Sequence, residues 1–151
     1  KESNMDLRKK TELIVIHCAA TKASMDIGAS EIKRWHVDDN GWDDIGYHYI
    51  VKRDGTVEVG RPEAFQGAHA PAVNSKSIGI CLVGGMADDG GAENNFTLQQ
   101  FLALKDLIKR LIMTNSNIQE IVGHCDIQEN KKDCPGFNLK EWLFKEDIKC
   151  G

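Results

Sequence analysis

The chain has 151 residues, of which 41% are hydrophobic, and this suits one domain with an ordinary buried core and excludes a multidomain assembly. Its 19 basic and 23 acidic side chains give a formal net charge of -4, so we expect neither nucleic acid nor a membrane among its partners. The longest apolar run near the N-terminus covers residues 13–16, far fewer than a membrane span or an export signal needs. Five irregularly spaced cysteines favour a reducing compartment or a metal site over a disulfide framework.

The N-terminal third predicts an arm, a strand and a short helix. Residues 1–11 are polar and charged, so we expect them to lie outside a folded domain that spans 12–151. Residues 13–17 are mostly apolar and rich in β-branched side chains, which predicts a strand covered on both faces. Ser30 then precedes apolar residues at helical spacing and predicts the N-cap of an amphipathic helix over 31–37.

The middle of the chain predicts three more strands. Residues 46–52 and 56–59 are rich in strand-forming residues, and the intervening Asp54-Gly55 pair predicts a hairpin. Residues 78–83 form the next strand, in which Gly79 marks a place where another backbone or a ligand comes close.

The last third predicts a long core helix between a loop and a final strand. An acidic, glycine-rich loop over 86–95 is followed by Thr97 and Gln100, which form a capping box ahead of a broad apolar stripe. A short strand at 121–123 and a loop over 125–137 come next.

A final helix begins after Asn138, which with Glu141 forms a second cap. The order of elements predicts an α/β (α+β) fold, a single domain with a central mixed sheet flanked by helices. In such a fold, ligand chemistry is expected at strand ends and loops.

Three potential metal ligands stand at such places. His17 closes the first strand, His124 follows the last, and Cys134 comes ten residues later. Two imidazoles and one thiolate satisfy the needs of a catalytic zinc, which takes three protein ligands and leaves a fourth position open. Their spacing matches no local zinc signature, so a structural role for each residue remains an alternative on these grounds alone.

Several segments resemble the zinc-dependent N-acetylmuramoyl-L-alanine amidases, above all their phage endolysin branch, which includes the amidase lysozymes of the T-odd coliphages. Animal peptidoglycan recognition proteins are similar at a greater distance. The matching segments, found in order between Glu12 and Trp142, are residues 15–22, 41–58, 67–70, 77–85 and 95–97. The resemblance implies a peptidoglycan recognition protein/amidase-like fold.

The resemblance also implies a function, a cofactor and a site. The expected reaction is zinc-dependent hydrolysis of the amide bond between N-acetylmuramic acid and L-alanine, so peptidoglycan is the expected partner. We expect the enzyme to be a monomer. We expect the protein to be cytoplasmic until it is released to the cell wall, and its origin as a phage, prophage or autolysin protein stays open. The residues implied are zinc ligands His17, His124 and Cys134, catalytic Tyr47 and Lys132, and substrate-binding His36 and His69.

The loop between the second histidine and the cysteine is about two residues longer than in the phage enzymes. Lys131 is therefore an alternative to Lys132 as the catalytic lysine. Three other side chains of the loop are alternative metal ligands: Cys125, Asp126 and Asp133.

Neighbours of the candidate site residues are expected to point elsewhere. Because side chains alternate along a strand, His48 should face away from the site that Tyr47 faces and should be structural. The same divergence predicts packing or loop roles for Cys18 and Cys125.

Two other classes of function compete with a zinc amidase. Some proteins of this fold bind peptidoglycan without cleaving it, usually after the loss of a metal ligand, but all three ligand positions are filled here. A cysteine hydrolase would use Cys134 or Cys125 as the nucleophile and His124 as the base, without a metal. Metal analysis and sensitivity to chelators distinguish these possibilities.

Overall fold

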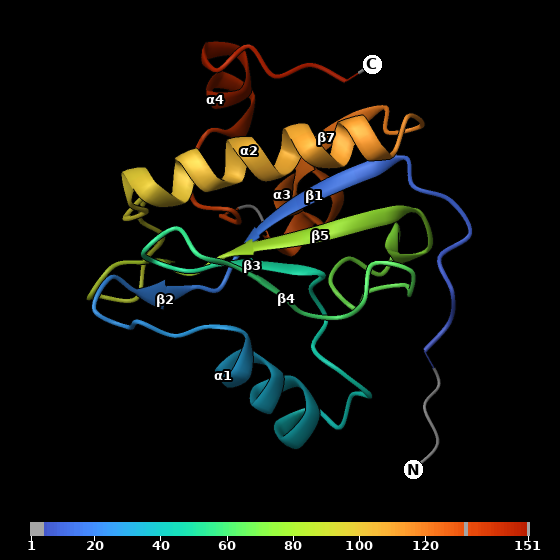
Figure 1. The fold of residues 1–151 in the computed structure, drawn as a ribbon. Coiled ribbons are helices and arrows are strands. Elements are labelled where there is room, and N and C mark those ends of the chain that lie inside the picture. Colours follow the sequence, from blue (N-terminus) through green and yellow to red (C-terminus); the bar gives the residue numbers. More distant parts are fainter. Residues whose placement is uncertain (1–4, 132, 151) are drawn as a thin grey trace.

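The computed structural model describes residues 5–131 and 133–150, and its centre is a five-stranded mixed sheet (Figure 1). Three neighbouring pairs along the sheet are parallel, and only the edge strand β4 runs antiparallel to its neighbour β3. The predicted mixed sheet and the hairpin around Asp54-Gly55 are therefore confirmed. The strands, in their order across the sheet, are β4 (Val57–Val59), β3 (Tyr49–Val51), β5 (Ser77–Leu82), β1 (Leu13–Cys18) and β7 (Glu120–Gly123).

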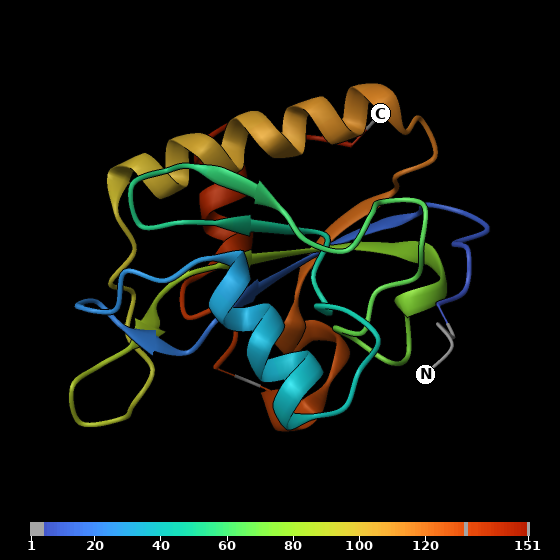
Figure 2. The same cartoon turned by 60° about the horizontal axis from the view of Figure 1, so that its bottom comes forward.

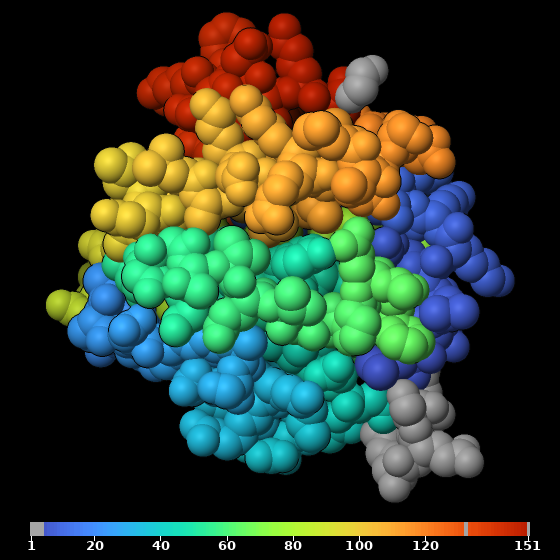
Figure 3. Space-filling model, viewed as in Figure 1, coloured from blue at the N-terminus to red at the C-terminus, as the bar shows by residue number. Residues whose placement is uncertain are grey.

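Helices cover both faces of this sheet (Figures 1 and 2). The long helix α2 (Leu98–Thr114) crosses one face, and α4 (Leu139–Lys145) lies beside it. The short helix α1 (Ala29–Arg34), which continues as a π-helical turn over Trp35–Asp39, lies on the opposite side. Side chains of α2 and of the β3–β4 hairpin form one continuous surface (Figure 3). Among the described residues, no helix is long and apolar enough to span a membrane.

The alternation of side chains along β1 decides which face carries the chemistry. Ile14 and Ile16 pack in the main apolar cluster together with Leu104 and Ile108 of α2. Val15 belongs to a separate cluster on the other face. Because side chains alternate, His17 lies on the same face as Val15, away from α2.

Side-chain caps begin two of the helices as predicted. The Thr97 hydroxyl accepts the backbone N–H of Gln100 at 3.1 Å, and the Gln100 side chain accepts the N–H of Thr97 at 3.0 Å. The Asn138 side chain accepts the N–H of Glu141 at 3.0 Å. The predicted Ser30 cap is wrong, because α1 begins at Ala29, two residues earlier than predicted, and its N-cap is Gly28.

Short elements were missed in both regions that were predicted as loops. Strand β6 (Gly85–Met86) pairs with β2 (Thr21–Lys22) as a separate small sheet. Helix α3 (His124–Ile127) and a 3₁₀ turn over Glu129–Lys131 occupy much of 125–137. A further 3₁₀ turn covers Asn74–Lys76. Such elements are too short to show a hydrophobic period.

Part of the predicted N-terminal arm lies against the rest of the protein. The backbone N–H of Arg8 donates to the carbonyl of Ala64 at 2.7 Å, and Leu7 forms an isolated β-bridge with Phe65. The division of the chain at residue 12 stays a prediction.

Candidate metal centre and active site

The pairing of two parallel strands places two histidines side by side. Strand β7 lies beside β1 with Gly123 opposite Ile16, so His17 of β1 lies beside His124, the first residue after β7. Their Nδ1 atoms are 3.0 Å apart, and their ring centroids are 4.3 Å apart. The prediction that chemistry gathers at strand ends therefore fits the observed placement of both imidazoles.

The chain after β7 reverses and brings Cys134 to the same place. The N–H of Cys125 donates to the carbonyl of Cys134 at 2.9 Å, which holds the two ends of the turn together. A Cβ at Gly123 would lie only 2.9 Å from Cδ of Pro135, so this close approach requires glycine. One ligand atom from each of His17, His124 and Cys134 lies within 4.8 Å of the others.

The chemistry of these three side chains suits a divalent metal ion. Burial lowers the pKa of both imidazoles, that of His17 strongly, so both are neutral and able to act as ligands near pH 7. A hydrogen bond with the Cys18 thiol, together with burial, raises the pKa of Cys134, so its thiolate needs a cation beside it. A metal ion would supply that positive charge.

The alternative ligands from the longer loop stand outside this group. Within 5–131 and 133–150, the group that could hold a metal consists of the two histidines and Cys134. The Asp126 carboxylate instead accepts the N–H of Gly123 at 2.9 Å and caps α3. Neither Cys125 nor Asp133 belongs to the group.

Cys18 lies closer to the site than the sequence indicated. Its sulfur is 3.8 Å from the sulfur of Cys134. Its backbone N–H donates to the Cys134 sulfur at 3.2 Å, an interaction that stabilises a thiolate. The packing role predicted for Cys18 is therefore incomplete, because only the folded chain brings β1 beside Cys134.

Tyr47 borders the metal-binding group. Its ring centroid is 5.1 Å from that of His17, and burial is the main reason why the pKa of its hydroxyl is raised well above 10. The nearby thiols of Cys81, Cys134 and Cys18 raise this pKa further. The hydroxyl thus remains protonated and able to donate a hydrogen bond near pH 7.

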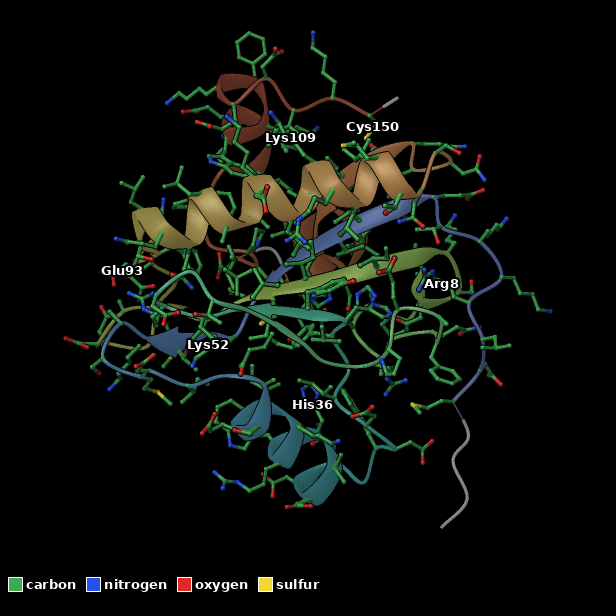
Figure 4. All side chains as sticks on the ribbon, in the orientation of Figure 1. Arg8, His36, Lys52, Glu93, Lys109 and Cys150 are labelled. Atoms are coloured by element: carbon green, nitrogen blue, oxygen red, sulfur yellow. The ribbon has the colours of Figure 1, made fainter. Side chains whose placement is uncertain are left out.

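An open pocket of about 480 Å³ lies next to His124 and Tyr47. His36 and the half-exposed Trp42 line it, with ring centroids 4.5 Å apart. Figure 4 labels His36, which lies between its helix and the sheet. The N–H of Gly46 donates to Nδ1 of His36 at 2.9 Å, so in the neutral ring Nε2 carries the proton and is a donor.

His69 also lines this pocket, but it is almost fully buried. Its Nδ1 is 2.8 Å from Nε2 of His17, so the structure places it behind a predicted metal ligand. Its predicted contact with substrate stays a prediction. The sequence predicted a backbone or a ligand close to Gly79, but the structure places a side chain there, because a Cβ at Gly79 would lie 2.6 Å from Cγ of His69.

His48 has a structural position, although the reason given for it was wrong. Strand β3 begins at Tyr49, so strand alternation does not apply to Tyr47 and His48. His48 lies near His69, with ring centroids 5.8 Å apart. Both of its ring nitrogens bind backbone, one donating to the carbonyl of Phe65 and the other accepting the N–H of Gly79.

Of the two candidate lysines, only Lys131 is among the residues that the structure describes. Lys132 lies outside the described residues. Lys131 is exposed and lines both the pocket beside His124 and a second pocket, of about 210 Å³, beside Cys134. Its positive charge is one of the smaller causes of the lowered pKa of His17 and His124.

Gln128 is a site residue that the sequence analysis missed. Its side-chain oxygen is 2.7 Å from Nε2 of His124. The two residues are four apart and join through α3, since the N–H of Gln128 also donates to the carbonyl of His124 at 3.0 Å. A spacing of four residues on one helix face was the available signal, but α3 itself was not predicted.

Comparison with known proteins identifies the family. A family model described as N-acetylmuramoyl-L-alanine amidase matches residues 7–137. The endolysin of Klebsiella phage KP32 is 44% identical over 141 residues, which make up 93% of this chain and 91% of the relative. The endolysin of Enterobacteria phage T3 is 45% identical over 141 residues, with the same coverage of 93% and 91%. Both relatives support the resemblance to phage endolysins.

A solved structure agrees with the sequence relatives. The N-acetylmuramoyl-L-alanine amidase LysC from Clostridium intestinale URNW has a TM-score of 0.80 and 29% identity, covering 97% of this chain and 92% of that one. The chain belongs to the N-acetylmuramoyl-L-alanine amidase family. The predicted family and fold class are confirmed.

Proposed function

We propose that this chain is a zinc-dependent enzyme that hydrolyses the amide bond between N-acetylmuramic acid and L-alanine in peptidoglycan. The observation that carries the proposal is the convergence of His17, His124 and Cys134 from separate segments, with their ligand atoms within 4.8 Å of one another. The family supplies the bond and the substrate class. Residues 12–151 would form the catalytic domain, which acts on the cell wall after its release.

The donor set favours zinc among the common metals. Two neutral imidazoles and a thiolate are typical zinc ligands, whereas magnesium and calcium prefer oxygen. When bound, zinc would supply an activated water and polarise the carbonyl of the scissile amide. His17, His124 and Cys134 would hold the ion and leave one position open.

Two side chains are placed to stabilise the negative charge that develops on the carbonyl oxygen. Tyr47 keeps its proton and can donate a hydrogen bond to that oxygen. Lys131 brings a positive charge to the edge of the site, where the two pockets meet. These residues act on the transition state and are not needed to hold the metal.

The pocket beside His124 would hold part of the substrate. His36 offers an N–H donor there, and the Trp42 indole offers an apolar surface next to it. Aromatic rings and a few polar donors are typical of sites that bind polar ligands of moderate size. We propose that the pocket binds a segment of the glycan or stem peptide, with His36 and His69 on its wall.

Digestion of purified peptidoglycan tests this function. Zinc-loaded protein should release stem peptides with new L-alanine amino termini and create no new reducing ends. Labelling of free amino groups, followed by mass spectrometry of the products, distinguishes the two outcomes. New reducing sugars without new amino termini would show glycosidase activity and would contradict the proposal.

Paired variants of the two lysines test which of them acts. Replacing Lys131 by methionine should lower kcat by about 10²-fold, on the scale of losing one charge-stabilising donor, and should leave zinc binding unchanged. Lys132→Met is the paired variant, because the family resemblance implies the same role for Lys132. The opposite ranking, measured on soluble muramyl peptide, would assign the role to Lys132.

A further inference from the structure

The imidazole of His17 is the first member of a chain of buried polar groups that leads away from the metal site. Its Nε2 is 2.8 Å from Nδ1 of His69, and Nε2 of His69 is 3.2 Å from the hydroxyl of Ser77. That hydroxyl donates to the carbonyl of Val73 at 2.7 Å. All three side chains are buried, since His17, His69 and Ser77 are 1%, 6% and 0% exposed.

The hydrogen bond from Ser77 to Val73, the last in this series of polar groups, fixes the direction of the other hydrogen bonds in the series. A serine hydroxyl has one proton, and Ser77 gives that proton to Val73, so its oxygen must accept from Nε2–H of His69. The neutral His69 ring then has a lone pair on Nδ1. That lone pair accepts from Nε2–H of His17, which leaves a lone pair on Nδ1 of His17.

His124 reaches the same state through a different partner. The side-chain oxygen of Gln128 can only accept, so Nε2 of His124 carries the proton and Nδ1 carries a lone pair. The two Nδ1 atoms face each other at 3.0 Å. Two lone pairs at this distance repel each other, and a cation placed between them and the Cys134 sulfur would remove the repulsion.

We propose that His69 and Ser77 are positioning residues that hold His17 in the tautomer that binds metal through Nδ1, with Gln128 serving His124 in the same way. The inference rests on the proposed metal site and deepens it. Partners of this kind orient the ligand ring and raise its basicity, and their loss typically lowers metal affinity about 10- to 100-fold.

The packing around His69 supports this role. Its ring lies against Gly79 of β5, where a Cβ would be 2.6 Å from the ring, and against Gly67, where a Cβ would be 2.5 Å from it. The side chain of Asn74 accepts the backbone N–H of His69 at 3.1 Å. The close approach of the two glycines leaves the ring little room to move, and the Asn74 hydrogen bond holds the backbone of His69 in place.

The test is the dissociation constant for Zn²⁺, measured by competition with a chromophoric chelator. His69→Leu should weaken zinc binding about 10- to 100-fold. His69→Gln should restore most of the affinity, because its amide can accept from His17 and donate to Ser77. Ser77→Ala should cause a smaller loss, because the acceptor for His17 remains but the tautomer of His69 is no longer fixed.

His48→Leu is the matched control, since it removes a buried histidine whose nitrogens bind only backbone groups. It should lower thermal stability and leave zinc affinity unchanged. Wild-type affinity in His69→Leu, or an equal loss in His48→Leu, would overturn the inference while the metal site stands. Failure of the unmodified protein to bind Zn²⁺ would overturn the proposed metal site itself.

Discussion

Replacing Cys134 by serine is expected to remove the bound metal and the amidase activity together. The thiolate is the only anionic ligand of the three, and the remaining imidazoles cannot offset the charge of a divalent ion. Activity should fall by more than the about 10²- to 10³-fold that the loss of one transition-state donor costs. Metal content and release of stem peptide would be measured on the same preparation.

Cys150→Ser is the control, because Cys150 is a free thiol near the C-terminus. It packs against the main apolar cluster and does not belong to the metal-binding group. It should keep both metal and activity. A Cys134→Ser enzyme that retains full zinc occupancy would remove the cysteine from the site. Activity that survives exhaustive chelation but is lost on thiol alkylation would instead support a cysteine hydrolase.

Replacing Tyr47 by phenylalanine is expected to separate catalysis from metal binding. The ring that packs beside His17 is kept, so zinc affinity should be unchanged. The hydroxyl that stays protonated is lost, and kcat should fall about 10²- to 10³-fold with little change in KM. Steady-state kinetics on muramyl peptide and zinc titration provide the two readouts.

The matched control for this variant is Tyr49→Phe, because Tyr49 lies on the α2 side of the sheet with its hydroxyl hydrogen-bonded to Glu63. It should leave kcat unchanged. A Tyr47→Phe enzyme with wild-type turnover would exclude Tyr47 from the mechanism.

The sequence predicted the main strands and the long helix because these elements are long enough to show a pattern. The apolar run of β1, the Asp54-Gly55 turn and the Thr97 capping box each depend on neighbours in the chain. The two-residue strands β2 and β6 and the four-residue helix α3 carry no such pattern. Their formation depends on contacts between distant segments.

The same distinction applies to the site. The candidate metal ligands His17 and His124 drew attention because they lie at strand ends, and the family resemblance supported them together with Cys134 and Tyr47. The position of Cys18 beside Cys134, and that of His69 behind His17, depend on residues that are 116 and 52 positions apart. Residue types alone give no sign of such contacts, so these groups became visible only in the folded chain.

X-ray absorption spectroscopy of the zinc-loaded protein tests the central claim most directly. The account predicts one zinc per chain, with one sulfur at about 2.3 Å and nitrogen ligands at about 2.0–2.1 Å in its first coordination shell. His17→Ala should remove one nitrogen from this shell, and Cys134→Ser should leave no zinc bound in the site. A coordination shell without sulfur, or one that neither variant changes, would contradict the account.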